Sequence, residues 1–314
     1  MTATTTTTAR PASTTIHRLG EGPVWDMPRE RLLWVDILAG DVHEGTLVDG
    51  QVEVTRTTHA DLTVGAVVPS ADGRLLVAGH TALLELAEEP VSGVHLPVLP
   101  DGSGRRLNDG ACDPAGRFLV GSLALTGRSR TEILCRLEDD GQLTPLDDDL
   151  SLSNGLAWSP DGHLLYSVDT LPGTVWVRGY DPVTGAVGPR RPHLDVDGLP
   201  DGLCADTDGN LWIAVWGQGQ VRCYAPSGRV LHTVVVPAPH TSSVAFAGDG
   251  LGTLVITTAT DGLTAEQRRR YPDSGRLFTA PVEARGLPST PWNGHGLPSP
   301  ASPSPTTTPP RSGT

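Results

Sequence analysis

The sequence predicts an all-β fold, a six-bladed β-propeller with four-stranded blades around a central metal-binding channel, and three observations support this prediction. An internal repeat of six units has a period in the forties, which is typical of propeller blades. The apolar runs within each unit are short, rich in β-branched residues and separated by glycine and proline. Polar residues recur at one position of the repeat, where the first strand of each blade should line the channel.

The repeat unit consists of an apolar triplet, a polar turn and a second apolar run. The six copies read VWDMPRERLLWV, VVPSADGRLLVA, ACDPAGRFLVGS, LAWSPDGHLLYS, LCADTDGNLWIA and AFAGDGLGTLVI. Alignment of their turns places six residues in one column: Glu30, Gly73, Gly116, Gly162, Gly209 and Gly252. Successive members of this column are 43, 43, 46, 47 and 43 residues apart. Four of these turns read Asp-Gly or Ala-Gly, a hairpin signal in which glycine supplies a positive φ. A solenoid of helix pairs has a similar period, but these short runs sustain no helical periodicity.

The repeats place the propeller at residues 14–285. Residues 2–8 are nearly all threonine, and the chain from Gly286 onward is rich in proline, serine and threonine. Such compositions offer little apolar surface to offset the entropy of ordering. We therefore expect residues 1–13 to be a disordered Thr-rich N-terminus and residues 286–314 to be a disordered tail. A strand over residues 14–18 would complete the last blade and close the ring.

Composition limits the partners and the location of the protein. The net charge of −13 argues against a nucleic-acid surface, because few cations are present to neutralise phosphates. The four cysteines (Cys112, Cys135, Cys204 and Cys223) have no C-x-x-C spacing and are expected to be buried thiols. The opening MTATTTTTAR lacks the apolar core of a secretory signal, and no window is apolar enough to span a membrane. We expect a soluble, cytoplasmic protein with no membrane contact and no obligate protein partner.

One column of the repeat carries the candidate site. The residues eight or nine positions before each turn are Glu21, Val64, Asn108, Asn154, Asp201 and Ser243. Five of these six are polar, although a strand should begin to be buried there. Because equivalent positions of successive blades meet at the axis of a propeller, we expect these side chains to converge at the mouth of the channel.

Glu21, Asn154 and Asp201 would supply oxygen ligands from three directions. Carboxylate and amide oxygens suit Ca²⁺, Mg²⁺ or Mn²⁺, and Zn²⁺ or Fe²⁺ is also compatible. Each residue alone could be an ordinary turn residue, since Asn-Gly and Asp-Gly pairs are common in turns. Convergence of the column favours a site for one divalent cation over that reading.

At these residues the sequence resembles the gluconolactonase/regucalcin (senescence marker protein) family. The matching stretches are LGEGPVWD, RLNDGACDPAGRFLVGS, LSNGLAWSPDGHLLYSVDT, PDGLCADTDGNLWIAVWGQGQV and TSSVAFAGDGLGTLVITTA, in this order over about residues 19–282. One departure is LALTGR, which places Thr126 near the position where some members have a glutamate that binds sugar hydroxyls.

The resemblance implies a carboxylic-ester hydrolase that opens an aldonolactone, a small-molecule substrate, to the open-chain acid. It implies that Glu21, Asn154 and Asp201 bind one divalent metal ion, with Ca²⁺ or Zn²⁺ favoured over Mg²⁺, Mn²⁺ or Fe²⁺. It also implies that Arg106 and Asn108 contact the substrate and that Asp201 is the general base. A carboxylate held on a cation is a poor base, so water activated by the metal is an open alternative to Asp201.

Other functions are compatible with the same fold. A related propeller could hydrolyse phosphotriesters or aryl lactones with the same metal. A non-enzymatic reading is a calcium-binding propeller or a protein-interaction scaffold, although a scaffold does not need acids and amides at matched axial positions. A substrate panel would distinguish these alternatives.

Overall fold

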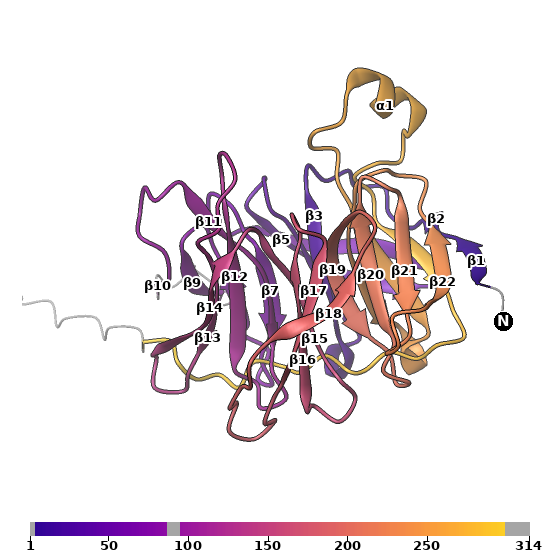
Figure 1. The fold of residues 1–314 in the computed structure, drawn as a ribbon. Helices are drawn as coiled ribbons and strands as arrows, with labels where there is room; N and C mark the ends of the chain where they lie inside the picture. Colours follow the sequence, from indigo (N-terminus) through magenta and orange to yellow (C-terminus); the bar gives the residue numbers. More distant parts are fainter. Residues whose placement is uncertain (1–3, 87–94, 299–314) are drawn as a thin grey trace, which may run out of the picture.

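Six antiparallel sheets form a ring in the computed structural model of the chain, which describes residues 4–86 and 95–298 (Figure 1). In five sheets the four blade strands are consecutive in sequence, and the sixth sheet takes its outermost strand from the N-terminus. The first strands of neighbouring blades contact one another around the ring. The predicted six-bladed, four-stranded propeller is thereby confirmed.

The strands follow the repeat units. Blade one contains β3 (Gly20–Asp26), β4 (Arg31–Asp36), β5 (Asp41–Val48) and β6 (Gln51–His59). Blade two contains β7 (Ala66–Pro69), β8 (Leu75–Ala78), β9 (Ala82–Leu86) and β10 (His95–Pro97). Blade three contains β11 (Arg105–Cys112), β12 (Phe118–Ala124), β13 (Glu132–Leu137) and β14 (Leu143–Leu150). Blade four contains β15 (Ser153–Trp158), β16 (Leu164–Asp169), β17 (Thr174–Gly179) and β18 (Arg191–Asp195). Blade five contains β19 (Leu199–Ala205), β20 (Leu211–Trp216), β21 (Gln220–Tyr224) and β22 (Val230–Val235). Blade six contains β23 (Thr241–Ala247), β24 (Thr253–Thr258) and β25 (Phe278–Pro281).

The turns between the first two strands of each blade follow the predicted hairpin chemistry at four positions. The φ angles are positive at Gly73 (97°), Gly116 (84°), Gly162 (74°) and Gly209 (79°). Glu30 adopts φ 49° after the short 3₁₀ helix Met27–Arg29, an uncommon left-handed conformation for a residue with a side chain. Gly252 has φ −105°, because a second 3₁₀ helix, Asp249–Leu251, replaces the tight turn in blade six.

The hydrophobic core lies between neighbouring blades. Trp34, Phe118 and Phe278 are among its largest fully buried side chains. One cluster joins Trp34 of blade one to Trp212 of blade five and Phe246 of blade six, so the blades are held together by shared apolar packing. The cysteines are free thiols, with Cys204 half-buried and the other three buried.

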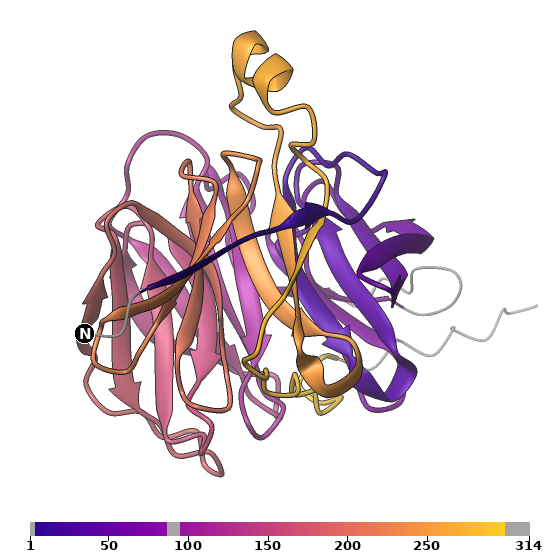
Figure 2. The ribbon, with the colours of Figure 1, turned by 90° about the vertical axis from the view of Figure 1, so that its right-hand side faces the viewer.

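The expectation of a disordered N-terminus does not hold for residues 4–13. Strand β1 (Thr5–Thr8) pairs in parallel with β22 and adds a fifth strand to blade five, and β2 (Arg10–Pro11) pairs with β25 to complete blade six. Figure 2 shows this indigo segment running across the outer edges of the orange blades. Residues 14–18 form no strand, so the ring closes through β2. Threonine is β-branched and suits a strand wherever a sheet edge offers unpaired backbone groups.

The C-terminal boundary also differs from the expectation. Residues 286–298 form a strap that crosses the ring at the end opposite helix α1 (Ala265–Arg270), and Figure 1 shows it in yellow. Isolated bridges join Gly286 to Asp206 and Trp292 to Ser70, and the Trp292 side chain is buried. The rest of the predicted disordered tail, residues 299–314, lies outside the described residues, as do residues 1–3. In the described part of the chain no helix is long and apolar enough to cross a membrane.

Candidate metal centre at the head of the channel

The six column residues form one buried layer at the beginning of the innermost strands. None is more than 6% exposed, as expected for side chains that converge on an axis: Glu21, Val64, Asn108, Asn154, Asp201 and Ser243. Asn108 Nδ2 donates to Ser153 O at 2.9 Å, which joins blade three to blade four. Ser242 Oγ donates to Gly20 O at 2.6 Å, which joins blade six to blade one.

The glycines that directly follow Asn154 and Asp201 allow blades four, five and six to approach one another closely at this level. A Cβ atom at Gly155 would lie 2.6 Å from Asp201 O, and one at Gly202 would lie 2.0 Å from Ser243 Oγ. Neither distance could be tolerated by a side chain, so glycine is required for blades four, five and six to meet at this level. The Asn-Gly and Asp-Gly pairs of the sequence therefore serve the packing of the axial layer.

The innermost strands are irregular at the same level. The pairing register between the first two strands of a blade shifts next to the column residue in five blades, at Glu21, Asn108, Asn154, Asp201 and Ser243. A bulge of this kind releases one or two residues from the ladder and redirects their side chains. The bulges release Asn108, Asn154 and Asp201 from the ladder. Glu21 and Ser243 lie at the edge of a bulge and stay paired with Val35 and Thr257.

The structure brings the predicted metal ligands into electrostatic and hydrogen-bonding contact. The Asn154 amide lies beside Asp201 and lowers the pKa of that carboxyl. Burial and the charge of Asp109 outweigh this effect and raise the pKa of Asp201. Burial, followed by the charge of Asp201, raises the pKa of Glu21. The layer therefore concentrates buried negative charge.

Asn154 provides the most informative atom of the layer. Its Nδ2 donates to Thr170 Oγ1 at 3.1 Å, whereas its Oδ1 is buried and accepts no hydrogen bond from any residue that the structure describes. A buried polar atom without a partner is costly, and a bound ligand is one way to satisfy it. Two buried carboxylates with an unpaired amide oxygen fit a hard divalent cation.

Arg106 and Asn108 occupy the blade-three side of the layer. Arg106 Nη1 donates to Asn108 Oδ1 at 2.7 Å and to Leu107 O at 2.8 Å. Burial lowers the pKa of Arg106 to about 10, against the opposing charges of Glu21 and Asp201. The guanidinium is therefore still charged at neutral pH, and it partly offsets the negative charge of the layer.

No three His, Cys, Asp or Glu side chains within residues 4–86 and 95–298 come together as a metal-binding cluster. The predicted ligand set has two such residues and an amide, so it is a different kind of donor set. Its three members come from β3, β15 and β19, in blades one, four and five.

Sequence reasoning missed two residues of this layer. Asp109 is a third acidic group, and burial raises its pKa to about 6. Its position directly after Asn108, inside the bulge of β11, was the available signal. Thr170 follows β16 and lies outside the column, so the repeat alignment carries no signal for its contact with Asn154.

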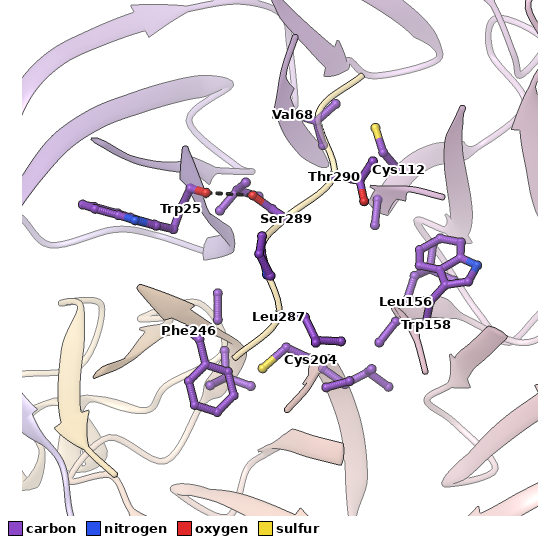
Figure 3. Close-up of a pocket in the computed structure, with 18 of the residues that line it drawn as sticks. Trp25, Val68, Cys112, Leu156, Trp158, Cys204, Phe246, Leu287, Ser289 and Thr290 are labelled. Carbon is purple, nitrogen blue, oxygen red and sulfur yellow. Dashed lines mark hydrogen bonds between the residues drawn. The ribbon is translucent and has the colours of Figure 1, made fainter. Parts of the chain in front are cut away.

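A cavity of about 460 Å³ lies on the axis below this layer (Figure 3). Asp109 and Ser243 line it at the end nearer the site, and mostly apolar side chains line the rest. Residues 287–290 of the strap pass across it, and Ser289 Oγ donates to Trp25 O at 2.7 Å. The strap therefore covers the channel at the end opposite the polar layer.

Comparison with known proteins identifies similar chains along nearly the whole length. A family model described as the SMP-30/Gluconolactonase/LRE-like region matches residues 19–260. A Bacillus subtilis protein, YvrE, named as a sugar lactone lactonase, is 34% identical over 282 residues, which are 88% of this chain and 95% of the relative. Regucalcin of Gallus gallus is 33% identical over 288 residues, 88% of this chain and 96% of the relative.

A solved structure shows the same architecture. The calcium-binding protein regucalcin from Agrobacterium tumefaciens superimposes with a TM-score of 0.84 and 26% identity. The match covers 93% of this chain and 99% of the other.

Proposed function

The chain belongs to the SMP-30/gluconolactonase/LRE-like family, and from this membership we propose that it hydrolyses a sugar lactone to the open-chain acid with one divalent cation held by Glu21, Asn154 and Asp201. The observation that carries the proposal is the buried, unpaired Oδ1 of Asn154 beside Asp201, in a layer that also contains Glu21. This amide oxygen has no hydrogen-bond partner among the described residues, and amide oxygens are suitable ligands for Ca²⁺.

The donor set suits the charge of the ion. Glu21 and Asp201 together neutralise a divalent cation, and Asn154 adds a ligand without further charge. When bound, such a cation supplies positive charge that stabilises the negative charge developing on the lactone carbonyl oxygen. Because the layer is buried, this electrostatic stabilisation would be stronger than in water.

The other polar groups of the layer would hold the substrate and move protons. The charged Arg106 side chain is held in place by the hydrogen bond from its Nη1 to Asn108 Oδ1 at 2.7 Å. Its remaining N–H groups would be fixed donors for the oxygens of a lactone. Asp201 would accept the proton of the attacking water, which makes it both ligand and base. A lactone placed between the cation and Arg106 would thus be oriented from two sides.

Substitution of Asp201 by Ala tests this assignment. The variant should lose at least about a thousandfold in kcat/KM for lactone hydrolysis and should bind the cation more weakly. The measurements are a pH-indicator assay on gluconate, arabinonate, galactonate and xylonate lactones, with and without chelator, and metal analysis of the purified protein. Asp72→Ala is the control, because Asp72 lies in an exposed hairpin turn where it accepts from Ser70 Oγ. Full lactonase activity in Asp201→Ala, or activity that chelator leaves unchanged, would refute the proposal.

A second candidate function is cation binding without catalysis, favoured by the description of the Agrobacterium relative as a calcium-binding protein. Tight Ca²⁺ binding with no turnover of any lactone would support it. Aryl lactones and phosphotriesters belong in the same substrate panel, because the exposed Thr126 lies near the position where some family members have a glutamate that binds sugar hydroxyls.

A further inference from the structure

The exposed leucines of the protein gather at one end of the ring. Every leucine or isoleucine that is exposed within residues 4–86 and 95–298 belongs to a segment at the end where the polar axial layer lies and where α1 rises above the blades (Figure 1): Ile16, Leu62, Leu125, Leu171 and Leu199. Single exposed leucines are common on protein surfaces. A shared location at the mouth of a channel instead indicates a surface that receives an apolar group.

Two of these leucines lie on segments that enter the innermost strands. Leu62 stands two residues before Val64, the column residue of blade two, and is 68% exposed. Leu199 is the first residue of β19 and stands two residues before Asp201. Each is therefore one step outside the buried layer, at the level that a substrate must pass.

Two others directly follow the second strand of a blade. Leu125 follows β12, and its N–H donates to Gly104 O at 2.8 Å, just before β11 begins. Leu171 follows Thr170, whose Oγ1 accepts from Asn154 Nδ2 at 3.1 Å. The loop that begins with Leu125 reads LTGRSRT between β12 and β13, so it has no carboxylate to accept hydrogen bonds from sugar hydroxyls.

An aromatic pair continues the apolar surface over blades five and six. Trp216 lies opposite Leu199 in the ladder between β19 and β20. Its half-buried ring stacks on His240 with centroids 4.2 Å apart and planes at 16°. His240 Nδ1 donates to Asp261 O at 2.8 Å, at the start of the segment that carries α1. The pair is therefore held in a fixed position at the same end of the ring.

We propose that these side chains form an apolar collar around the mouth of the channel, and that the collar binds an alkyl substituent on the lactone ring. The apolar collar consists of Ile16, Leu62, Leu125, Leu171, Leu199 and Trp216. The inference rests on the proposed function, since it assumes that a lactone is opened at the axial layer.

The arrangement of the collar favours this occupant. Ligand sites combine a few placed polar groups with an apolar lining, and here the polar groups lie in the axial layer and the apolar ones lie around its opening. A lactone ring that reaches the layer would leave its substituent at the level of the collar. The leucines lie on separate loops with charged neighbours, for example Asp61 beside Leu62, which suits a group entering the opening better than a flat protein or lipid surface.

A pair of alkyl lactones tests the substrate class. The ring of γ-valerolactone carries a methyl group, whereas that of γ-nonalactone carries a pentyl chain. Each further methylene that is fully buried raises kcat/KM by up to about fourfold. The parent should therefore hydrolyse γ-nonalactone with a kcat/KM at least about tenfold higher than γ-valerolactone, after each value is divided by the rate of hydrolysis by hydroxide alone.

The double variant Leu62→Ser/Leu171→Ser tests the collar itself. Both side chains are exposed, so the variant should fold, and thermal unfolding checks this. The preference for γ-nonalactone over γ-valerolactone should fall by at least about fivefold. Val183→Ser is the matched control, because Val183 is 79% exposed and lies between β17 and β18, at the end of the ring away from the axial layer. Its preference should equal that of the parent.

The outcomes distinguish this inference from the proposed function. A parent that opens neither alkyl nor sugar lactones overturns both. A parent that opens sugar lactones but does not prefer the longer alkyl chain overturns only the collar. A preference that survives in the double variant, or an equal loss on both alkyl lactones, also overturns the collar. Binding of the parent but not the double variant to phosphatidylcholine vesicles, without any chain-length preference, would assign these side chains to a lipid surface and would overturn the inference.

Discussion

Two buried imidazoles, His17 and His43, lie beside the Trp34 indole in blade one. Trp34 Nε1 donates to His17 Nε2 at 2.9 Å, and His17 Nδ1 donates to Gly275 O at 2.8 Å, so the neutral ring has a partner at each nitrogen. The His43 ring stacks on Trp34 with centroids 5.3 Å apart. Burial lowers the pKa of His17, and burial, followed by repulsion from His17 when that ring is protonated, lowers the pKa of His43 from 6.5 to about 4.

These shifts predict a loss of stability in mild acid. Between pH 6.5 and 4 these imidazoles are protonated in the unfolded chain but remain neutral in the folded protein. The free energy of unfolding should therefore fall as the pH drops from 6.5 toward 4. For His43 alone the loss at pH 5 is about 2 kcal/mol. Urea unfolding at neutral pH and near pH 5 should show a smaller loss in His43→Phe, which keeps a ring on Trp34 but cannot titrate.

The comparison depends on the change with pH, because His43→Phe also removes a hydrogen bond to Thr57 at either pH. His59→Phe is the control, since the His59 side chain is 69% exposed. It should follow the parent. Parallel pH dependences in His43→Phe and the parent would contradict the assignment.

Single residues of the site were predictable only where the repeat fixed their position. A spacing of eight or nine residues from the turns identified Glu21, Asn108, Asn154 and Asp201 as one level of the ring, and the structure buries all four. Thr170 was not predictable, because its contact with Asn154 joins the end of β16 to the bulge of β15. That contact depends on a register shift that side-chain spacing does not reveal.

At the scale of elements, the pattern of apolar runs predicted the strands within the blades but not the closure of the ring. The pairing of β1 with β22 joins Thr5 to His232, and β2 pairs with β25 near the other end of the chain. A threonine run has no apolar alternation, so local pattern cannot distinguish an edge strand from a low-complexity tail. The partner edge exists only after the propeller has formed.

Stepwise deletion tests the importance of this closure. Removal of residues 1–8 takes away β1, an addition to an already complete blade, and should lower the free energy of unfolding by about 1 kcal/mol. Removal of residues 1–12 also takes away β2 and the backbone bonds that Ala12 makes with Leu277 and Val52. It should cost about 3 kcal/mol or more and leave β25 as an open edge prone to aggregation. Equal unfolding midpoints for the two deletions would show that β2 does not close the ring.

At the scale of the whole molecule, the strap links blades one, two and five. Gly286 bridges Asp206 of blade five, Ser289 bonds to Trp25 of blade one, and Trp292 bridges Ser70 in the β7–β8 turn of blade two. Composition predicted disorder here because proline and serine dominate. Two apolar side chains nevertheless pack against the assembled ring, with Trp292 buried and Leu287 half-buried.

Trp292 anchors the strap, and its removal should separate fold stability from the chemistry of the axial layer. The indole is 1% exposed, its Nε1 donates to His295 O at 2.9 Å, and the Arg74 guanidinium lies 5.2 Å from the ring. Trp292→Ala should lower the free energy of unfolding by about 3–5 kcal/mol, as expected for a large buried aromatic side chain. Ser289→Ala should cost only about 1 kcal/mol, because it removes one hydrogen bond.

Release of the strap should also uncover the cavity of about 460 Å³ that lies between the strap and the axial layer. We therefore expect Trp292→Ala to bind an apolar fluorescent dye, whereas the parent and Ser289→Ala should not bind it. The cation Kd of Trp292→Ala should stay within about twofold of the parent value, because the strap and the axial layer lie at opposite ends of the innermost strands. Denaturant unfolding, dye titration and calorimetry measure the three quantities on the same preparations. If Trp292→Ala were as stable as the parent, the strap would contribute nothing to the stability of the ring. If Trp292→Ala no longer bound the cation, the two ends of the channel would be coupled.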